Sequence, residues 1–192
     1  MITRRQAIAL TAAGAGGLFG LRPALAAGDE PVLTDDGLWH QPWFIESFLE
    51  LADDLRTTAG NGKRFVVMWE LKGCPYCKET HFVNFARPDI RDFVRDGFDI
   101  LQLNIIGSRI VTDFDGEQMS EKDLARKYQI RFTPTLQFFR SADGLGDRAP
   151  KDREATRAQG YLQPDHFLAM FRFVSAQAYD TMTFRQWLKS QG

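Results

Sequence analysis

The stretch FVVMWELKGCPYC, residues 65–77, decides the fold and contains both cysteines of this 192-residue chain. Its first part, 65–69, is apolar, β-branched or aromatic, which is typical of a buried strand. A short link leads to Cys74, and Pro75 is suited to the first turn of a helix. Apolar residues then continue at helical spacing. The stretch therefore predicts a strand, a turn and a cysteine at a helix N-terminus.

The spacing of the two cysteines favours a redox-active disulfide. A bridge between Cys74 and Cys77 closes so short a loop that it constrains the unfolded chain very little, which makes a structural role a poor explanation. The dipole and the free N–H groups at a helix N-terminus stabilise a thiolate. We therefore expect Cys74 to be the exposed attacking thiolate and Cys77 to be the shielded thiol that resolves the mixed disulfide.

A zinc site is the alternative use of these cysteines, because His81 follows Cys77 by four residues. Zinc takes four protein ligands at a structural site, or three and a water at a catalytic one. The chain has no second cysteine pair, and His40 and His166 stand outside any ligand pattern. We expect no metal and no cofactor beyond the disulfide, and we expect His81 to be an ordinary residue at the surface or boundary of its helix.

Residues 1–26 have the pattern of a cleaved export signal. Arg4 and Arg5 precede an apolar run of small residues, and a small-x-small sequence predicts cleavage after Ala26. The two arginines favour the twin-arginine route, with the Sec route as the alternative. We therefore expect a periplasmic protein.

Composition points to a globular domain, with 44% apolar and 26% charged residues. The net charge of −1 gives no indication of nucleic-acid binding. No later apolar run approaches the length of a membrane-spanning helix. We expect an extended leader over 27–42 and one domain over 43–192.

The remaining patterns predict an alternation of helices and strands. The expected elements are a helix over 44–55, a helix from Pro88, a strand over 98–105, a hairpin between 110 and 117 with its turn at Asp115-Gly116, a helix after Ser120, a strand after Pro134, an exposed loop over 147–157, a strand near 158–161, a helix from Pro164 and a last helix over 184–188.

This order of elements, with Cys-x-x-Cys at a helix start and Thr-Pro before a strand, resembles the thioredoxin superfamily over residues 43–175. Segments 73–78, 112–116 and 132–135 are similar to the SoxW group of thioredoxin-like proteins from bacterial sulfur-oxidation operons. The resemblance implies an α/β thioredoxin-like fold, with a central mixed β-sheet flanked by helices, an N-terminal helix and a C-terminal helical extension.

The resemblance also implies roles for residues around the cysteines. Pro134 matches the cis-proline that faces the disulfide, although a trans proline at an ordinary edge strand is the alternative. Thr133 matches the residue whose backbone is open to pair with a substrate strand. Pro75 and Tyr76 stand between the cysteines, where they tune the reduction potential.

One position departs from the family pattern. Thioredoxins often carry a buried acid six residues before the first cysteine, where this chain has Met68. Glu70 lies two residues further on, and alternation along a strand places both on one side. We hypothesise that Glu70 assists proton transfer when the resolving thiol attacks. A solvent-exposed loop carboxylate is the alternative.

The resemblance implies an oxidoreductase that reduces disulfides of partner proteins in thiosulfate oxidation. A sulfur carrier such as SoxYZ is the expected client, and a membrane thiol transporter is the expected electron donor. Two alternatives are open: a periplasmic disulfide oxidase or isomerase, and a non-catalytic binding protein with a static disulfide.

Overall fold

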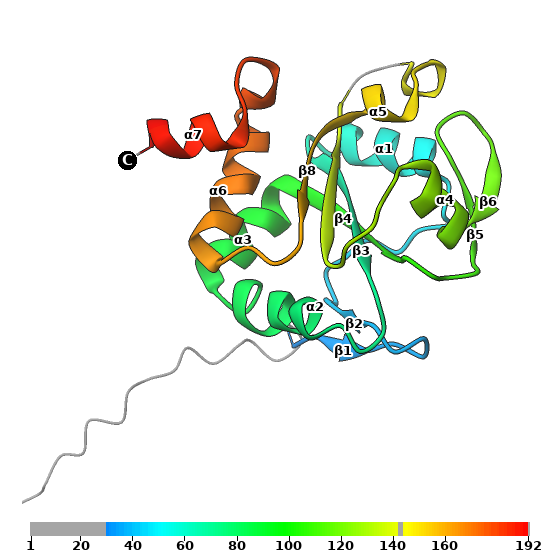
Figure 1. Ribbon diagram of the computed structural model, residues 1–192, viewed down its shortest axis with the longest axis horizontal. Coiled ribbons are helices and arrows are strands. Elements are labelled where there is room, and N and C mark those ends of the chain that lie inside the picture. The colour runs from blue at the N-terminus through cyan, green and yellow to red at the C-terminus, as the bar shows by residue number, and fades with distance from the viewer. Residues whose placement is uncertain (1–29, 142–143, 192) are drawn as a thin grey trace, which may run out of the picture.

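The computed structural model describes residues 30–141 and 144–191 (Figure 1). The predicted export signal, 1–26, and the start of the leader lie outside the described residues. Within the described ranges, no helix is long and apolar enough to cross a membrane.

A four-stranded mixed sheet forms the centre of the domain. Its strand order is β4-β3-β7-β8. The strands span Arg64–Glu70 (β3), Phe98–Asn104 (β4), Thr135–Phe139 (β7) and Glu154–Gln159 (β8). Strand β3 runs parallel to β4 and antiparallel to β7, and β7 pairs antiparallel with β8. The strand that precedes the cysteines is therefore hydrogen-bonded on both sides, which fixes where the chain leaves the sheet.

Helices cover both faces of this sheet, as the resemblance implies (Figure 1). The helices are α1 (Leu51–Gly60), α2 (Pro75–Glu79), which continues as the π-helical turn η1 (Thr80–Asn84), α3 (Pro88–Gly97), α4 (Glu121–Lys127), α5 (Pro150–Arg153), α6 (Pro164–Ser175) and α7 (Phe184–Ser190). Two 3₁₀ turns, η2 (Leu145–Asp147) and η3 (Ala178–Asp180), complete the helical elements. Two small hairpins pair β1 (Val32–Leu33) with β2 (Trp39–His40) and β5 (Ile110–Thr112) with β6 (Gln118–Ser120).

The alternation of side chains along β3 divides the core into two clusters. Val66 and Met68 pack with residues of α3 and α6 on one face. Val67 and Trp69 pack with residues of α1 and α4 on the other. The aromatic-rich sequence supplies both clusters, and the cysteines follow directly from the strand between them.

Several local predictions are confirmed. The hairpin β5–β6 turns at Asp115 and Gly116, where Gly116 takes a positive φ of 82°. The hydroxyl of Ser120 accepts a hydrogen bond from the backbone N–H of Asp123 at 3.1 Å and so caps α4. Prolines begin α3 and α6, as a fixed φ at the first helical position favours.

The helix predicted over 44–55 is wrong in its first half. Leu49 has a positive φ of 64°, and α1 begins only at Leu51. A left-handed residue cannot continue a right-handed helix, so the periodic residues before it belong to a loop. Within that loop, the side chain of Phe44 packs into the core, whereas that of Phe48 is 97% exposed.

The exposed loop predicted over 147–157 is also wrong. This segment forms α5 and most of β8, and Arg153 is buried. The leader differs as well, because its described part folds back as the hairpin β1–β2 instead of staying extended. The strand partner of β8 is β7, which precedes it across the intervening loop, whereas the leader pairs locally with itself.

Candidate redox site

The disulfide between Cys74 and Cys77 lies at the N-terminus of α2. Cys74 is the N-cap residue, and its Sγ accepts the backbone N–H of Cys77 at 3.1 Å. The same N–H would stabilise a thiolate on Cys74 after reduction. Cys74 is half-buried and Cys77 is only 3% exposed, which is the asymmetry expected of an attacking and a resolving cysteine.

The link between β3 and Cys74 is a tight turn. Gly73 adopts φ 76°, a left-handed conformation that favours glycine, and the N–H of Cys74 donates to the carbonyl of Leu71 at 3.1 Å. Pro75 follows at the first helical position, where no N–H is needed. The turn therefore places Cys74 just beyond the carboxyl end of β3, with α2 leading away from it.

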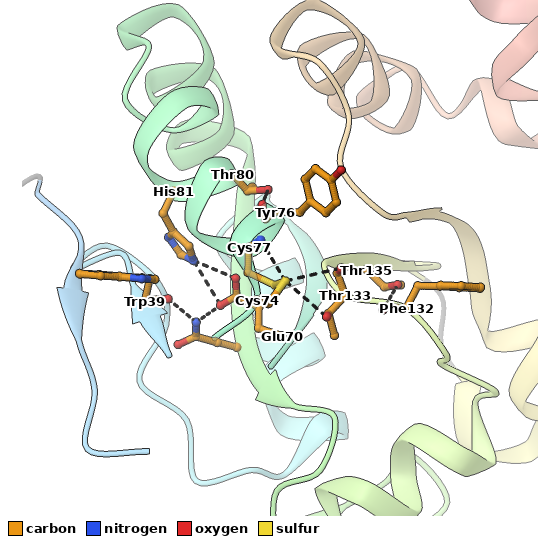
Figure 2. The surroundings of a disulfide bond; sticks show 11 residues. Trp39, Glu70, Cys74, Tyr76, Cys77, Thr80, His81, Phe132, Thr133 and Thr135 are labelled. Carbon is orange, nitrogen blue, oxygen red and sulfur yellow. Dashed lines mark hydrogen bonds and ion pairs between the residues drawn. A yellow bond between two sulfur atoms is a disulfide. The ribbon is translucent and has the colours of Figure 1, made fainter. Parts of the chain in front are cut away.

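The loop before β7 faces the disulfide (Figure 2). The Thr133–Pro134 peptide bond is cis, as the resemblance implies. The hydroxyl oxygen of Thr133 lies 3.5 Å from Sγ of Cys74, and the backbone carbonyl oxygen of Thr133 lies 3.6 Å from the same sulfur. The hydroxyl of Thr135 donates to the carbonyl of Phe132 at 2.7 Å. The backbone of Thr133 is thus held beside the reacting sulfur.

Two exposed aromatic rings border the disulfide. Tyr76 is 55% exposed and Phe132 is 59% exposed. Tyr76 stacks on Tyr161 with a centroid distance of 5.9 Å and an interplanar angle of 20°. Burial and the nearby carboxylate of Glu79 raise the pKa of Tyr161, so its ring remains a neutral stacking partner at neutral pH. Tyr76 stands between the two cysteines and Phe132 precedes Thr133, so both exposed rings belong to the segments that carry the site.

Glu70 is buried behind the disulfide, with 1% of its surface exposed. The alternative of a solvent-exposed carboxylate is therefore wrong. Nε2 of His81 lies 3.0 Å and 3.2 Å from the two carboxylate oxygens, and Nε2 of Gln102 donates to one of them.

The prediction for His81 is wrong, since its side chain is fully buried. His81 and Cys77 are four residues apart, so both face inward on the turn that continues α2. A sequence signal was present in that spacing, because the predicted shielded cysteine marks the inner helix face. Gln102 had no comparable signal, because its contact with Glu70 depends on the parallel pairing of β3 with β4.

A hollow of about 270 Å³ lies beside the disulfide, between the hairpin β1–β2 and α2. Its lining residues are Gly37, Leu38, Trp39, Glu70, Leu71, Gly73, Cys74, Pro75, Cys77 and Lys78. Nζ of Lys78 lies 5.6 Å from the ring centroid of Trp39, a cation–π contact on the hollow's rim. Over the described ranges, no group of three or more His, Cys, Asp or Glu side chains could hold a metal ion.

A Cys-x-x-Cys disulfide at a helix N-terminus, with a half-buried first cysteine and a buried second, has the arrangement that thiol–disulfide exchange uses. The class of protein is a thiol–disulfide oxidoreductase. The family model described as a thioredoxin-like domain matches residues 51–175, and the chain belongs to this family.

The chain is similar to several solved structures. A thioredoxin-fold protein from Helicobacter pylori has 20% identity and a TM-score of 0.53, covering 68% of this chain and 84% of its own. A thioredoxin from Thermus thermophilus has 22% identity and a TM-score of 0.49, covering 65% of this chain and 81% of its own. The periplasmic thioredoxin SoxS from Paracoccus pantotrophus has 19% identity and a TM-score of 0.39, covering 60% and 99% respectively. No curated protein matches the sequence of this chain.

Proposed function

We propose that this chain is an exported reductant that keeps cysteines of periplasmic partner proteins in the thiol form. The observation that carries the proposal is the half-buried Cys74 at the N-terminus of α2, with the backbone of Thr133 beside its sulfur. That arrangement favours attack by one thiolate on a disulfide presented as an extended strand.

The reaction proceeds in two exchanges. In the reduced protein, the Cys74 thiolate attacks one sulfur of the client disulfide, and the other client sulfur leaves as a thiolate. Cys77 then attacks Sγ of Cys74 and releases the second client thiolate. Two electrons pass to the client, and the chain is left with its Cys74–Cys77 disulfide. No redox group beyond this disulfide is needed.

Client docking uses the surface next to Cys74. The exposed rings of Tyr76, which follows Pro75 between the cysteines, and of Phe132, which precedes Thr133, offer apolar contacts. The backbone of Thr133, held next to the sulfur before Pro134, can pair with an extended client segment. Such main-chain pairing tolerates many sequences, which suits a reductant that serves more than one protein.

The similarity of segments 73–78, 112–116 and 132–135 to SoxW proteins supports a role in thiosulfate oxidation. In this role the client is a sulfur-carrier protein such as SoxYZ, and a membrane thiol transporter supplies the electrons. The signal pattern over 1–26 supports the periplasm as the compartment.

The reduction potential of the Cys74–Cys77 pair tests the direction of the reaction. We expect a value near about −270 mV, as for thioredoxin, when the protein is equilibrated against glutathione and dithiothreitol buffers. A value near about −120 mV would identify a disulfide oxidase and would contradict the proposal.

A trapping experiment tests the client. We expect the Cys77→Ser variant to form a mixed disulfide with an oxidised sulfur carrier, because its Cys74 can attack but nothing resolves the intermediate. The Cys74→Ser variant is the matched control and should form none. A parent protein that reduces the client no faster than Cys74→Ser does would instead indicate a binding protein with a static disulfide.

A further inference from the structure

A groove lined by basic side chains lies next to the loop that faces the disulfide. Its volume of about 620 Å³ exceeds the 270 Å³ of the hollow beside the cysteines and is in the range of protein binding sites. Four cations line this basic groove, Lys127, Arg131, Lys151 and Arg157, together with the carboxylate of Glu154. The whole chain carries a net charge of −1, so the groove is a local concentration of positive charge.

Two of the four cations are committed to the fold. Nζ of Lys127 lies 2.6 Å from the fully buried carboxylate of Asp113. Arg157 forms an ion pair with Glu154 and donates to the carbonyl of Tyr128 at 3.0 Å. The charges of Lys127 and Arg157 are therefore already compensated, and so is the charge of the groove's carboxylate.

The other two cations have no partner. Arg131 and Lys151 are exposed, and neither side chain forms a hydrogen bond or ion pair with any residue that the structure describes. The exposed amides of Gln129 and Gln159 also line the basic groove. Cations and amide N–H groups are the donors that a carboxylate accepts from. The uncompensated charge of the groove is thus positive, and it lies among additional hydrogen-bond donors.

The backbone holds both unpaired cations in place. On one side of the groove, Gln129 takes a positive φ of 56°, and the buried Ile130 anchors the chain directly before Arg131. On the other side, Lys151 belongs to α5, whose last residue is the buried Arg153. A partner that docks here does not have to order these segments, which lowers the cost of binding.

The basic groove is continuous with the loop beside the reacting sulfur. Phe132 lines the groove and directly precedes Thr133, whose carbonyl oxygen lies 3.6 Å from Sγ of Cys74. Figure 2 shows the ring of Phe132 pointing away from the disulfide. The N–H of Gly160, next to the end of β8, donates to the carbonyl of Pro134 at 2.8 Å, so a second segment of the groove is attached to the same loop.

We propose that the basic groove binds an acidic segment of the client protein, with Arg131 and Lys151 as the cations that determine specificity. A strand advances about 3.3 Å per residue, so the segment lies about two to five residues from the client's reactive cysteine. Charge complementarity of this kind selects partners and speeds their encounter. The proposal rests on the proposed function, because it requires a client at Cys74, but it depends neither on the direction of electron transfer nor on which protein is the client.

A short peptide segment fits the groove better than a nucleic acid does. Binding along a nucleic-acid backbone uses a stripe or patch of many basic residues. Here the uncompensated charge comes from two side chains within one groove, next to a site that acts on cysteines.

Peptide disulfides of matched sequence test the proposal. Each peptide has one cysteine bonded to 2-thiopyridine and three glutamates either before or after it, and glutamines replace the glutamates in the reference peptides. The Cys74 thiolate of the reduced protein attacks the peptide sulfur, and the thiopyridine leaves and is measured by its absorbance. At about 20 mM salt we expect one of the glutamate peptides to react about tenfold faster than its reference. The ratio should fall to about twofold at about 500 mM salt, which screens exposed charges.

Two double variants locate the effect. In Arg131→Gln/Lys151→Gln, the ratio of glutamate to glutamine rates should fall below about twofold at about 20 mM salt. Lys122→Gln/Lys189→Gln removes two exposed cations outside the groove and should keep the tenfold ratio. Each ratio is measured within one variant, so differences in folding or in sulfur reactivity cancel.

A binding measurement without redox chemistry separates the groove from the proposed function. The oxidised parent is titrated with the faster-reacting glutamate peptide, or with both if neither reacts, after serine has replaced the cysteine. The backbone amide NMR signals of Gln129, Arg131 and Lys151 should shift. Sodium sulfate at the same concentration should shift them less, because a small anion contacts fewer of the groove's donors.

Three outcomes would overturn the proposal. Equal rates for glutamate and glutamine peptides with the parent would show that the groove does not read charge. Equal ratios in the two double variants would assign the acceleration to the field of the whole protein. Shifts with sulfate as large as with the peptide would assign the groove to a small anion. If no peptide reacts but the groove signals shift with the serine peptide, the proposed function fails and the assignment of the groove stands.

Discussion

The burial of Arg153 could not be predicted from its neighbours in sequence. It follows a run of exposed charged residues, yet its side chain is 3% exposed. Its guanidinium donates to Asp113 and Asp115 at 2.7 Å each and to the hydroxyl of Tyr128 at 3.0 Å. Burial alone would lower the pKa of Arg153, but the bonds to Asp115 and Tyr128 raise it above its usual value. The residue joins α5 to the hairpin β5–β6 and to the end of α4.

Substituting Arg153 should therefore destabilise the fold strongly. We expect Arg153→Met to lower the free energy of unfolding by about 3 kcal/mol, because it leaves the fully buried carboxylate of Asp113 without one of its two cations. Denaturant unfolding measures the change. Arg140→Met breaks the more exposed pair with Asp180 and should cost less than about 1 kcal/mol. Equal losses in the two variants would contradict this account.

The candidate site was predictable residue by residue to different degrees. The chemistry and spacing of Cys74 and Cys77 are local, so their placement at a helix start follows from the sequence alone. Strand alternation places Glu70 on the same side as Met68, and the resemblance drew attention to that side because the family carries a buried acid there. The contact between Glu70 and His81 depends on the wide turn of η1, and no local pattern predicts such a turn.

The hairpin β5–β6 is held to the helices beside it by ion pairs of its turn residue. Its turn residue Asp115 accepts hydrogen bonds from Lys127 at 2.8 Å and from Arg153 at 2.7 Å. Burial alone would raise the pKa of Asp115, but the bonds to Lys127 and Arg153 outweigh it and hold the pKa well below its usual value. The turn is thus attached to α4 and α5 by charge.

This lowered pKa predicts an acid-dependent loss of stability. A carboxyl whose folded pKa lies below its unfolded value contributes fully above the unfolded pKa, about 3.9, and the contribution is lost as pH falls through the folded value. We expect the unfolding free energy of the parent to fall between about pH 5 and about pH 2, and that of Asp115→Asn to fall less. Asp152→Asn removes an exposed carboxylate and should keep the parental slope. Identical slopes in all three proteins would refute the assignment.

Predictions of elements succeeded where a short signal fixes the backbone and failed where it does not. Prolines and a serine cap give the correct starts of α3, α4 and α6. The predicted helix over 44–55 followed apolar spacing across Leu49, whose left-handed conformation periodicity does not reveal. Strand β8 begins earlier than predicted, and its charged residues Glu154 and Arg157 form an ion pair with each other within this outer strand of the sheet.

At the scale of the whole molecule, the sheet separates two clusters of different character. The cluster with α6 is extended by α7, whose Phe184 and Trp187 pack against the buried Phe173 at centroid distances of 5.6 Å and 5.9 Å. Figure 1 shows α7 at the end of α6, away from the redox site on α2. The thioredoxin-like match ends at residue 175, so α7 is an addition to the family domain.

Truncation after residue 183 should separate stability from redox chemistry. We expect the free energy of unfolding to fall by about 2 kcal/mol, because two partly buried aromatic side chains no longer cover Phe173. The rate at which the reduced protein exchanges with a small chromogenic disulfide should keep its parental value. The double variant Arg185→Gln/Lys189→Gln leaves the packing intact and should unfold like the parent. A truncated protein with parental stability would show that α7 adds no packing energy.

The position of Trp39 on the wall of the hollow has an optical consequence. An excited indole transfers an electron readily to a neighbouring disulfide but not to a pair of thiols, so oxidation quenches its emission. Trp39 shares the hollow with both cysteines, whereas Trp69 is fully buried on the other face of the sheet. We therefore expect the tryptophan emission of the protein to rise when the disulfide is reduced, which would report its oxidation state without any label.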